Sequence, residues 1–202
     1  MRAGLRWFPP ALFGAGLVIL GYGLAYESGW RRVVVGVYLL WTVAELRVTF
    51  RGEAGETGGA DRGSMPLYGL ARGLVVLAAL LAAPAHSVVV PGLPLLVAGA
   101  VLRLAAIAQL GRFYSHKVRT VAGHQIVQTG PYRLVRHPAY TGMLIAHTGF
   151  VLVFLTSFSL TALALLAAAI VNRILVEERT LLRVRGYAAY ARGRKRLIPA
   201  VW

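Results

Sequence analysis

Residues 139–176 read AYTGMLIAHTGFVLVFLTSFSLTALALLAAAIVNRILV. Two apolar runs, 139–156 and 159–176, lie on either side of a short break at Ser157 and Phe158. Each run is long enough to cross the roughly 30 Å hydrocarbon core of a bilayer as an α-helix. Because the break is so short, the two runs are predicted to form a helical hairpin. Its two outer ends then lie on the same side of the membrane.

The rest of the chain has the same apolar character. Four more runs suited to membrane helices precede the hairpin, at residues 9–26, 33–50, 67–83 and 92–110. Of the 202 residues, 57% are apolar and only 14% are charged, although the net charge is +15. This hydrophobicity excludes a disordered basic tail and a ribosomal-type nucleic-acid binder. We therefore predict an all-α, polytopic transmembrane bundle of about six helices.

The distribution of basic residues predicts the orientation of this bundle. The segment 111–138 contains five Lys or Arg residues and no acidic residue, and the segment from 173 onward contains eight basic residues. The connections 84–91 and 157–158 contain none. Basic residues favour the cytoplasmic side of a membrane, so both basic segments are expected to face the cytosol. The abundance of Arg, Ala, Gly, Leu and Val favours a bacterial source and thus the bacterial cytoplasmic membrane.

The segment 111–138 is the longest polar stretch between two predicted helices. Pro131 and Pro138 interrupt it, and a helix would normally end before each of them. Loops of this length are usually functional or disordered, and the aromatic and β-branched residues here disfavour disorder. We expect a folded re-entrant or interfacial loop that forms a cytoplasmic site together with the C-terminal hairpin.

Acidic residues are nearly absent from the second half of the chain. Glu177 and Glu178 occur together at the end of the last predicted membrane helix. The hairpin brings them to the level of His137 and Tyr140. One interpretation is that the two carboxylates simply pair with neighbouring arginines on the helix surface. The other is that they belong to a polar site at the membrane face.

A short motif favours the second interpretation. Residues 130–142 read GPYRLVRHPAYTG. Each part alone has a structural explanation, such as a tyrosine belt at the lipid headgroups or a small-residue helix contact at Gly142. The pattern Gly-x-Tyr-x-x-x-Arg-His-Pro-x-Tyr-x-Gly, followed by a helical hairpin, an acidic cluster, paired tyrosines and a basic tail, resembles the isoprenylcysteine carboxyl methyltransferase superfamily. That superfamily includes phospholipid N-methyltransferase-like members, and the resemblance covers about residues 92–200.

The resemblance implies an integral membrane enzyme that uses S-adenosylmethionine as methyl donor. The family's cofactor-binding positions fall on Lys117, His124, Gln125, Ile126, Val127, Tyr132, His137, Pro138, Ala139, Tyr140 and Glu177. The family's substrate-contacting arginine falls on Arg173, which is the predicted catalytic residue. Two positions depart from the family pattern. Lys117 stands where glutamine is common, and the usual Phe-Gly-x-x-Tyr is shortened to Arg185-Gly186-Tyr187.

The chemistry of S-adenosylmethionine agrees with these residue types. The Glu177 carboxylate is suited to the ammonium group, and donors near Arg136 and His137 are suited to the carboxylate. Tyr132 or Tyr140 can pack on the adenine or on the sulfonium cation. Methyl transfer is an in-line displacement that needs positioning and a dry site, which an apolar bundle supplies. We therefore predict a methyltransferase for a membrane-resident or lipophilic acceptor, with carboxyl O-methylation of an isoprenoid-type substrate favoured.

This interpretation divides the chain into two parts. Residues 1–66 are expected to form an N-terminal two-helix membrane segment that ends in a polar, Gly-rich linker at 51–66. Residues 67–202 are expected to form the membrane-embedded methyltransferase core. The first part is not covered by the motif.

Three other functions remain open at this point. They are a phospholipid-amine N-methyltransferase, an NADPH-dependent membrane reductase of steroid or isoprenoid substrates, and a non-catalytic membrane protein that binds lipid. In each case the basic run 192–196 is expected to contact anionic membrane lipids, and no nucleic acid is expected as a partner. No metal is expected, because the histidines lack the spacing of metal ligands.

Four titratable residues within the predicted helices are considered separately from the motif. Arg72 is expected to snorkel toward the interface, and Arg103 either snorkels or lines the acceptor cavity. Glu45 is expected at the interface or in the bundle interior. His147 is expected to hydrogen-bond a neighbouring helix, with haem ligation as the less favoured alternative.

Overall fold

The structure is a computed structural model that describes residues 8–49, 63–81, 88–114 and 125–202. These residues contain no β-strand, and their helices are α1 (Phe8–Tyr26), α2 (Gly29–Thr49), α3 (Ser64–Leu81), α4 (Val89–Leu110), η4 (Gly111–Phe113), η5 (Gly130–Arg133), α5 (Pro138–Val153), α6 (Ser157–Leu181) and α7 (Tyr187–Arg192). The all-α prediction is confirmed, and each predicted membrane segment overlaps one of the helices α1 to α6. Residues 50, 82 and 83 of these segments lie outside the described residues. The short helix α7 was not predicted.

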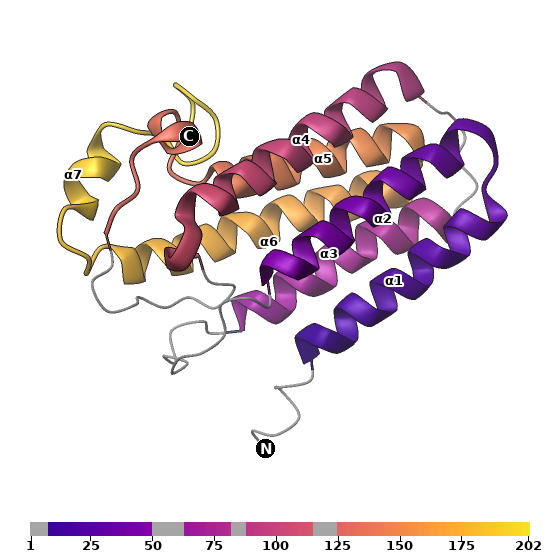
Figure 1. Ribbon diagram of the computed structural model, residues 1–202, viewed down its shortest axis with the longest axis horizontal. Coiled ribbons are helices and arrows are strands. Elements are labelled where there is room, and N and C mark those ends of the chain that lie inside the picture. The colour runs from indigo at the N-terminus through magenta and orange to yellow at the C-terminus, as the bar shows by residue number, and fades with distance from the viewer. Residues whose placement is uncertain (1–7, 50–62, 82–87, 115–124) are drawn as a thin grey trace.

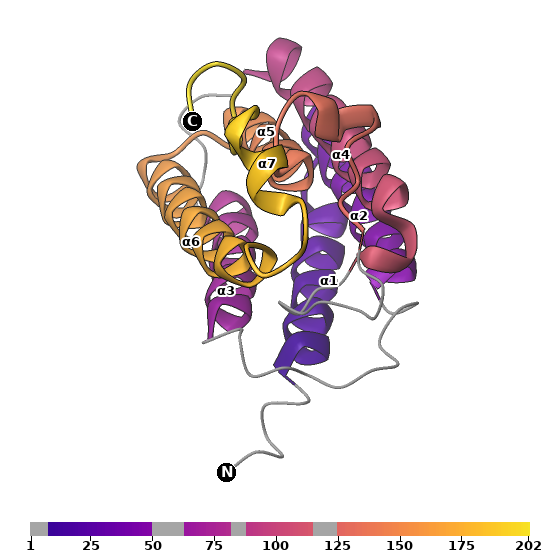
Figure 2. The same cartoon turned by 90° about the vertical axis from the view of Figure 1, so that its left-hand side faces the viewer.

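The long helices run lengthwise through one bundle (Figure 1). Helix α4 packs mainly on α5, and α3 packs mainly on α6. Helix α7, η5 and the C-terminus gather at one end of the bundle, on the left of Figure 1, and Figure 2 shows this end from the front. The ends of α4 and α6 and the start of α5 lie at the same end, which places residues 125–137 beside the hairpin (Figure 1).

The outer surface of the bundle is apolar. Large apolar side chains such as Val18, Leu40 and Leu165 are exposed on it, where lipid tails would surround them. Helical segments long and apolar enough to cross a membrane are Ser64–Leu81, Val90–Phe113 and Ser157–Leu181, and shorter apolar helices are Gly14–Tyr26 and Pro138–Val153. The chain is therefore an integral membrane protein.

The predicted hairpin between α5 and α6 is confirmed, but its turn lies at residues 154–156, just before the expected break at Ser157 and Phe158. Helix α5 ends at Val153, and α6 begins at Ser157. The Thr156 hydroxyl accepts a hydrogen bond from the Ser159 backbone N–H at 2.9 Å, and the Ser159 hydroxyl accepts one from the Thr156 N–H at 2.9 Å. This reciprocal capping box satisfies two backbone donors that the start of α6 would leave free.

Helices α4 and α5 approach one another backbone to backbone. A Cβ atom added at Gly142 would lie 2.6 Å from both the Arg103 backbone nitrogen and the Gly99 carbonyl oxygen. Gly149 meets Gly92 in the same way further along the pair. Small residues allow this approach, which is a common mode of helix packing in membranes. The predicted small-residue contact at Gly142 is confirmed.

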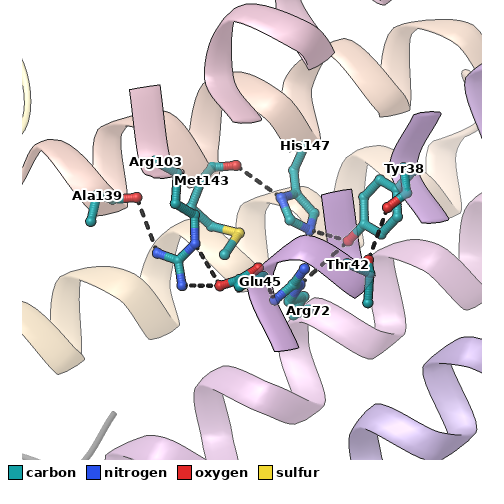
Figure 3. Close-up of polar contacts among 8 residues, drawn as sticks. All are labelled: Tyr38, Thr42, Glu45, Arg72, Arg103, Ala139, Met143 and His147. Atoms are coloured by element: carbon teal, nitrogen blue, oxygen red, sulfur yellow. Dashed lines mark hydrogen bonds and ion pairs between the residues drawn. The ribbon is translucent and has the colours of Figure 1, made fainter. Parts of the chain in front are cut away.

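The bundle interior contains a charged cluster from three helices (Figure 3). The Glu45 carboxylate of α2 is fully buried and lies 2.8 Å from Arg72 Nη1 of α3. Arg103 Nε of α4 donates to the other oxygen of Glu45 at 2.7 Å. Glu45 therefore faces the interior, and the predicted snorkelling of Arg72 is wrong. The buried carboxylate compensates the desolvation of both guanidinium groups, so they need not reach the interface.

Next to this cluster, His147 links α5 to α2. Its Nδ1 donates to the Met143 carbonyl oxygen at 2.8 Å, which leaves Nε2 to accept from the Tyr38 hydroxyl at 2.8 Å (Figure 3). Arg72 Nε lies 3.4 Å from the same hydroxyl. The predicted hydrogen bond from His147 to a neighbouring helix is confirmed.

Candidate active site

A cavity lies at the end of the bundle where the polar loop and α7 meet the long helices. Its wall is formed by residues of α3 to α7 and of the loop: Tyr68, Arg103, Leu110, Phe113, Tyr114, Gln125, Ile126, Val127, Tyr132, Arg136, His137, Ala139, Tyr140, Arg173, Glu177, Thr180, Leu181, Tyr187 and Tyr190. Segments that are far apart in the sequence thus meet around one space. Its charged and aromatic lining suits a polar ligand with a ring.

Most residues that the sequence predicted for the site line this cavity. The lining includes Gln125 to Val127, Tyr132, Arg136, His137, Ala139, Tyr140, Arg173 and Glu177. Of the described predicted residues, only Pro138 is absent from the lining, because it is buried at the first turn of α5. Lys117 and His124 lie outside the described residues. The role of each residue toward a ligand stays a prediction.

A hydroxyl group joins the predicted cofactor carboxylate to the predicted catalytic arginine. Tyr140 donates its hydroxyl proton to Glu177 Oε2 at 2.9 Å and accepts from Arg173 Nε at 3.1 Å. Arg173 Nη1 donates to the Ser64 hydroxyl of α3 at 2.8 Å. Helix α3 and the start of α5 therefore both orient the Arg173 guanidinium, which is only 3% exposed. Such a fixed, planar group can hold a carboxylate with two parallel hydrogen bonds.

The second acidic residue, Glu178, organises the motif. Arg136 Nη1 lies 2.7 Å from its Oε1, and Arg196 Nε lies 2.9 Å from its Oε2. His137 Nε2 lies 3.2 Å from Oε1. Arg136 and His137, which were predicted to bind the carboxylate of the cofactor, therefore both contact Glu178 in this structure. Arg136 keeps one free donor, because its buried Nε has no hydrogen-bond partner among the described residues.

The C-terminal tail holds the same motif by its backbone. Val135 and Lys195 form a parallel bridge, in which the Arg136 N–H donates to the Lys195 carbonyl at 2.8 Å. The His137 N–H donates to the Arg196 carbonyl at 3.0 Å. The residues after α7 are therefore bound to the motif and do not form a free basic tail.

The paired tyrosines of α7 support the wall of the cavity. Tyr190 donates its hydroxyl proton to the Tyr132 carbonyl at 2.9 Å, and the Tyr132 hydroxyl donates to the Ala106 carbonyl at 3.3 Å. Burial raises the pKa of Tyr190 to about 12 and also raises the pKa of Tyr132. Both phenols are therefore neutral at physiological pH and act as hydrogen-bond donors.

Sequence reasoning missed several parts of the wall. Tyr68 lies on α3, before the motif begins, and no spacing in the sequence connects it to the site. Tyr114 follows η4 directly and lies in a loop that was expected to be functional, so the loop itself was the available signal. Arg103 was considered for the acceptor cavity and does line the cavity, where its Nη1 donates to the Ala139 carbonyl at 3.2 Å.

The comparisons with known proteins concern this half of the chain. Residues 92–183 match the model of the isoprenylcysteine carboxyl methyltransferase (ICMT) family. Protein-S-isoprenylcysteine O-methyltransferase B of Arabidopsis thaliana is 34% identical over 105 residues, which are 50% of this chain and 53% of that protein. A probable protein-S-isoprenylcysteine O-methyltransferase of Oryza sativa subsp. indica is 31% identical over 105 residues, which are 50% of this chain and 55% of that protein.

A shorter match concerns protein-S-isoprenylcysteine O-methyltransferase A of Arabidopsis thaliana, which is 42% identical over 60 residues, 29% of this chain and 30% of that protein. The chain thus spans about half the length, or less, of the curated relatives it matches. The resemblance that the motif predicted is confirmed, because residues 92–183 are similar to the isoprenylcysteine carboxyl methyltransferase family.

Proposed function

We propose that the protein transfers a methyl group from S-adenosylmethionine to the carboxylate of a lipophilic, isoprenylcysteine-type acceptor. The observation that carries this proposal is the chain of contacts from Glu177 through the Tyr140 hydroxyl to Arg173 within one cavity. In this chain of contacts, the Tyr140 hydroxyl lies between the Glu177 carboxylate and the Arg173 guanidinium. An ammonium-bearing donor and a carboxylate-bearing acceptor need groups of these two charges.

The residues of the cavity fit S-adenosylmethionine. Glu177 would hold its ammonium group, and the free Nε of Arg136 is a donor for its carboxylate. The neutral rings of Tyr132, Tyr187 and Tyr190 offer faces for the adenine. When bound, this cofactor supplies an electrophilic methyl group on a sulfonium sulfur, which leaves as a neutral thioether.

The chain's own contribution is positioning. Arg173 would hold the acceptor carboxylate and so present one oxygen to the methyl group. Ser64 and Tyr140 keep the guanidinium in place, so little conformational freedom remains to be lost in the transition state. The apolar bundle excludes water, and the exposed apolar sides of its helices allow a prenyl chain to reach the site from the bilayer.

The proposed acceptor is a carboxylate rather than an amine, because a buried arginine repels a protonated amine. Substitution Arg173→Lys keeps the charge but removes the planar fork. We expect methyl transfer to an S-prenylcysteine acid in detergent micelles to fall at least tenfold, with the affinity for S-adenosylhomocysteine nearly unchanged. The assay is radiolabelled methyl transfer, and the affinity is measured by calorimetry.

Arg179→Lys is the matched control, because Arg179 lies on the same helix outside the cavity lining. It should leave both quantities unchanged. Loss of cofactor affinity in Arg173→Lys, with no change in preference between an acid and an amine lipid, would contradict the proposal and assign Arg173 to holding Glu177.

We further propose that the cavity opens toward the cytosol of a bacterial cell. The basic residues of 111–138 and 173–202 support this orientation, since Lys and Arg concentrate on the cytoplasmic side. The chain has no cysteine, so Gly193→Cys gives a single labelling site. A membrane-impermeant thiol reagent should label it only after the cells are opened. Labelling of intact cells would refute the orientation.

A further inference from the structure

Besides Arg136, the cavity lining includes a tyrosine whose hydroxyl has no partner among the described residues. Tyr68 of α3 lines the cavity and is only 4% exposed. Its hydroxyl is buried and has no hydrogen-bond partner among the described residues. A buried hydroxyl without a partner is destabilising, so its retention calls for an explanation beyond packing.

The surroundings of Tyr68 point to the acceptor side of the cavity. Ser64 lies four residues before Tyr68, so both side chains are on one face of α3. The Ser64 hydroxyl accepts the hydrogen bond from Arg173 Nη1 at 2.8 Å. The Tyr68 ring meets the Tyr140 ring edge-on, with centroids 6.2 Å apart. Tyr68 is therefore a neighbour of the Arg173–Tyr140 pair.

We propose that Tyr68 determines specificity by donating its hydroxyl proton to the carboxylate of the acceptor, and this inference rests on the proposed function. A carboxylate has about four lone-pair positions, so it can accept from Arg173 and from Tyr68 together. The remaining lone pairs stay available on the oxygen that accepts the methyl group. The hydroxyl alone could also accept from a protonated amine, but the guanidinium beside it can only donate. The pair together therefore favours a carboxylate over a protonated amine.

This assignment gives α3 a role that the family match does not cover. The match begins at residue 92, whereas Ser64 and Tyr68 precede it. Helix α3 would thus have two roles. Its Ser64 holds Arg173 in place, and its Tyr68 makes a second contact to the acceptor. A helix that precedes the family match then helps to select the substrate.

The test is Tyr68→Phe, which removes only the hydroxyl. Binding of an S-prenylcysteine acid to the full chain in detergent micelles is measured directly, without turnover, together with S-adenosylhomocysteine binding and thermal unfolding. We expect acid affinity to fall about tenfold or more, the scale of a hydrogen bond to a charged group. Affinity for the methyl ester should fall less, because its oxygens carry no charge. Cofactor affinity and the unfolding temperature should not decrease, since the hydroxyl has no partner to lose.

Tyr38→Phe is the matched control. Tyr38 is buried on the neighbouring helix, but its hydroxyl bonds His147 and it is not part of the cavity lining. This variant should lower the unfolding temperature and leave acid affinity unchanged. Equal acid affinity in the wild type and Tyr68→Phe would overturn the inference, as would an acid that does not bind the wild type. Acid binding without any methyl transfer by the wild type would instead refute the proposed function alone.

Discussion

Two glutamates of this protein are each held by two arginines, yet they lie in very different surroundings. Glu45 lies inside the bundle, and its partners Arg72 and Arg103 come from two other long helices. Glu178 lies at the end of the bundle, and its partners Arg136 and Arg196 come from the loop and the tail. The interior cluster therefore joins helices, whereas the end cluster joins the connecting segments that form the cavity. The same kind of ion pair therefore holds the helices together in the interior and holds the segments around the cavity together at the end of the bundle.

The largest expected effect separates the two regions by stability. Glu45→Gln removes the charge that compensates Arg72 and Arg103 and leaves two buried guanidinium groups. We expect the free energy of unfolding to fall by about 3–5 kcal/mol, as when one member of a buried ion pair is removed. Thermal unfolding in detergent measures it.

Glu27→Gln is the control for this experiment, because Glu27 lies in the connection between α1 and α2 and is only half-buried. Its effect should stay within about 0.5 kcal/mol. An unfolding temperature of Glu45→Gln equal to that of the wild type would mean that the interior cluster does not hold the helices together.

The next effect tests the end cluster. Glu178→Gln weakens the contacts with Arg136, His137 and Arg196 together. We expect a loss of about 2–3 kcal/mol in the free energy of unfolding, smaller than for Glu45 because water reaches this end of the bundle. Cofactor affinity should fall as well, because Arg136 and His137 lose the carboxylate that holds them in place. If cofactor affinity were unchanged, Glu178 would be structural only.

A third substitution should affect the site without affecting the fold. Glu177→Gln keeps a hydrogen-bond acceptor for Tyr140 but removes the charge proposed to hold the cofactor ammonium. We expect S-adenosylhomocysteine binding to weaken by about 1.5–3 kcal/mol. The unfolding temperature should stay close to that of the wild type. Calorimetric titration of both proteins decides it, and equal affinities in a folded variant would exclude Glu177 as the ammonium partner.

The smallest effect is a pH dependence confined to the end of the bundle. Burial raises the pKa of Tyr190 to about 12, above its unfolded value of about 10. The neutral phenol is thus favoured in the folded state, so its contribution to stability is complete below about pH 10. It decreases as pH rises toward about 12, because the unfolded chain loses its proton first. Tyr190→Phe should show a weaker decrease in unfolding temperature between pH 9 and pH 11 than the wild type does.

The same comparison shows what the sequence can and cannot predict. Apolar runs and a short polar break determine helices locally, so the six long helices and the hairpin were predictable, although the turn at 154–156 precedes the expected break. The motif 130–142 and Glu177 were predictable because the hairpin turn brings its two ends together. The pairing of Glu45 with Arg103 was not, since it joins side chains 58 residues apart that carry no common pattern. For the same reason Arg72 was assigned to the interface. Because the sequence shows no acidic partner for it, reaching the interface is the position with the smaller desolvation cost.

Tyr68 illustrates a second limit. Its neighbours on α3 are the apolar residues of an ordinary membrane helix, and a tyrosine among them resembles an interfacial anchor. Only the packing of α3 on α6 brings it to Arg173. The return of the tail to the motif was equally hidden, because backbone hydrogen bonds between Arg136 and Lys195 leave no trace in residue type.

The contact between tail and motif has a consequence for biosynthesis. Translation runs from the N-terminus, so the ribosome makes Lys195 and Arg196 after every helix of the bundle. The membrane helices can therefore insert and pack while the motif still lacks the backbone partners of Arg136 and His137. The contacts that support the cavity are then completed only after all of these helices have been made. A chain cut short just after α7 would be fully inserted in the membrane and still have an incomplete cavity.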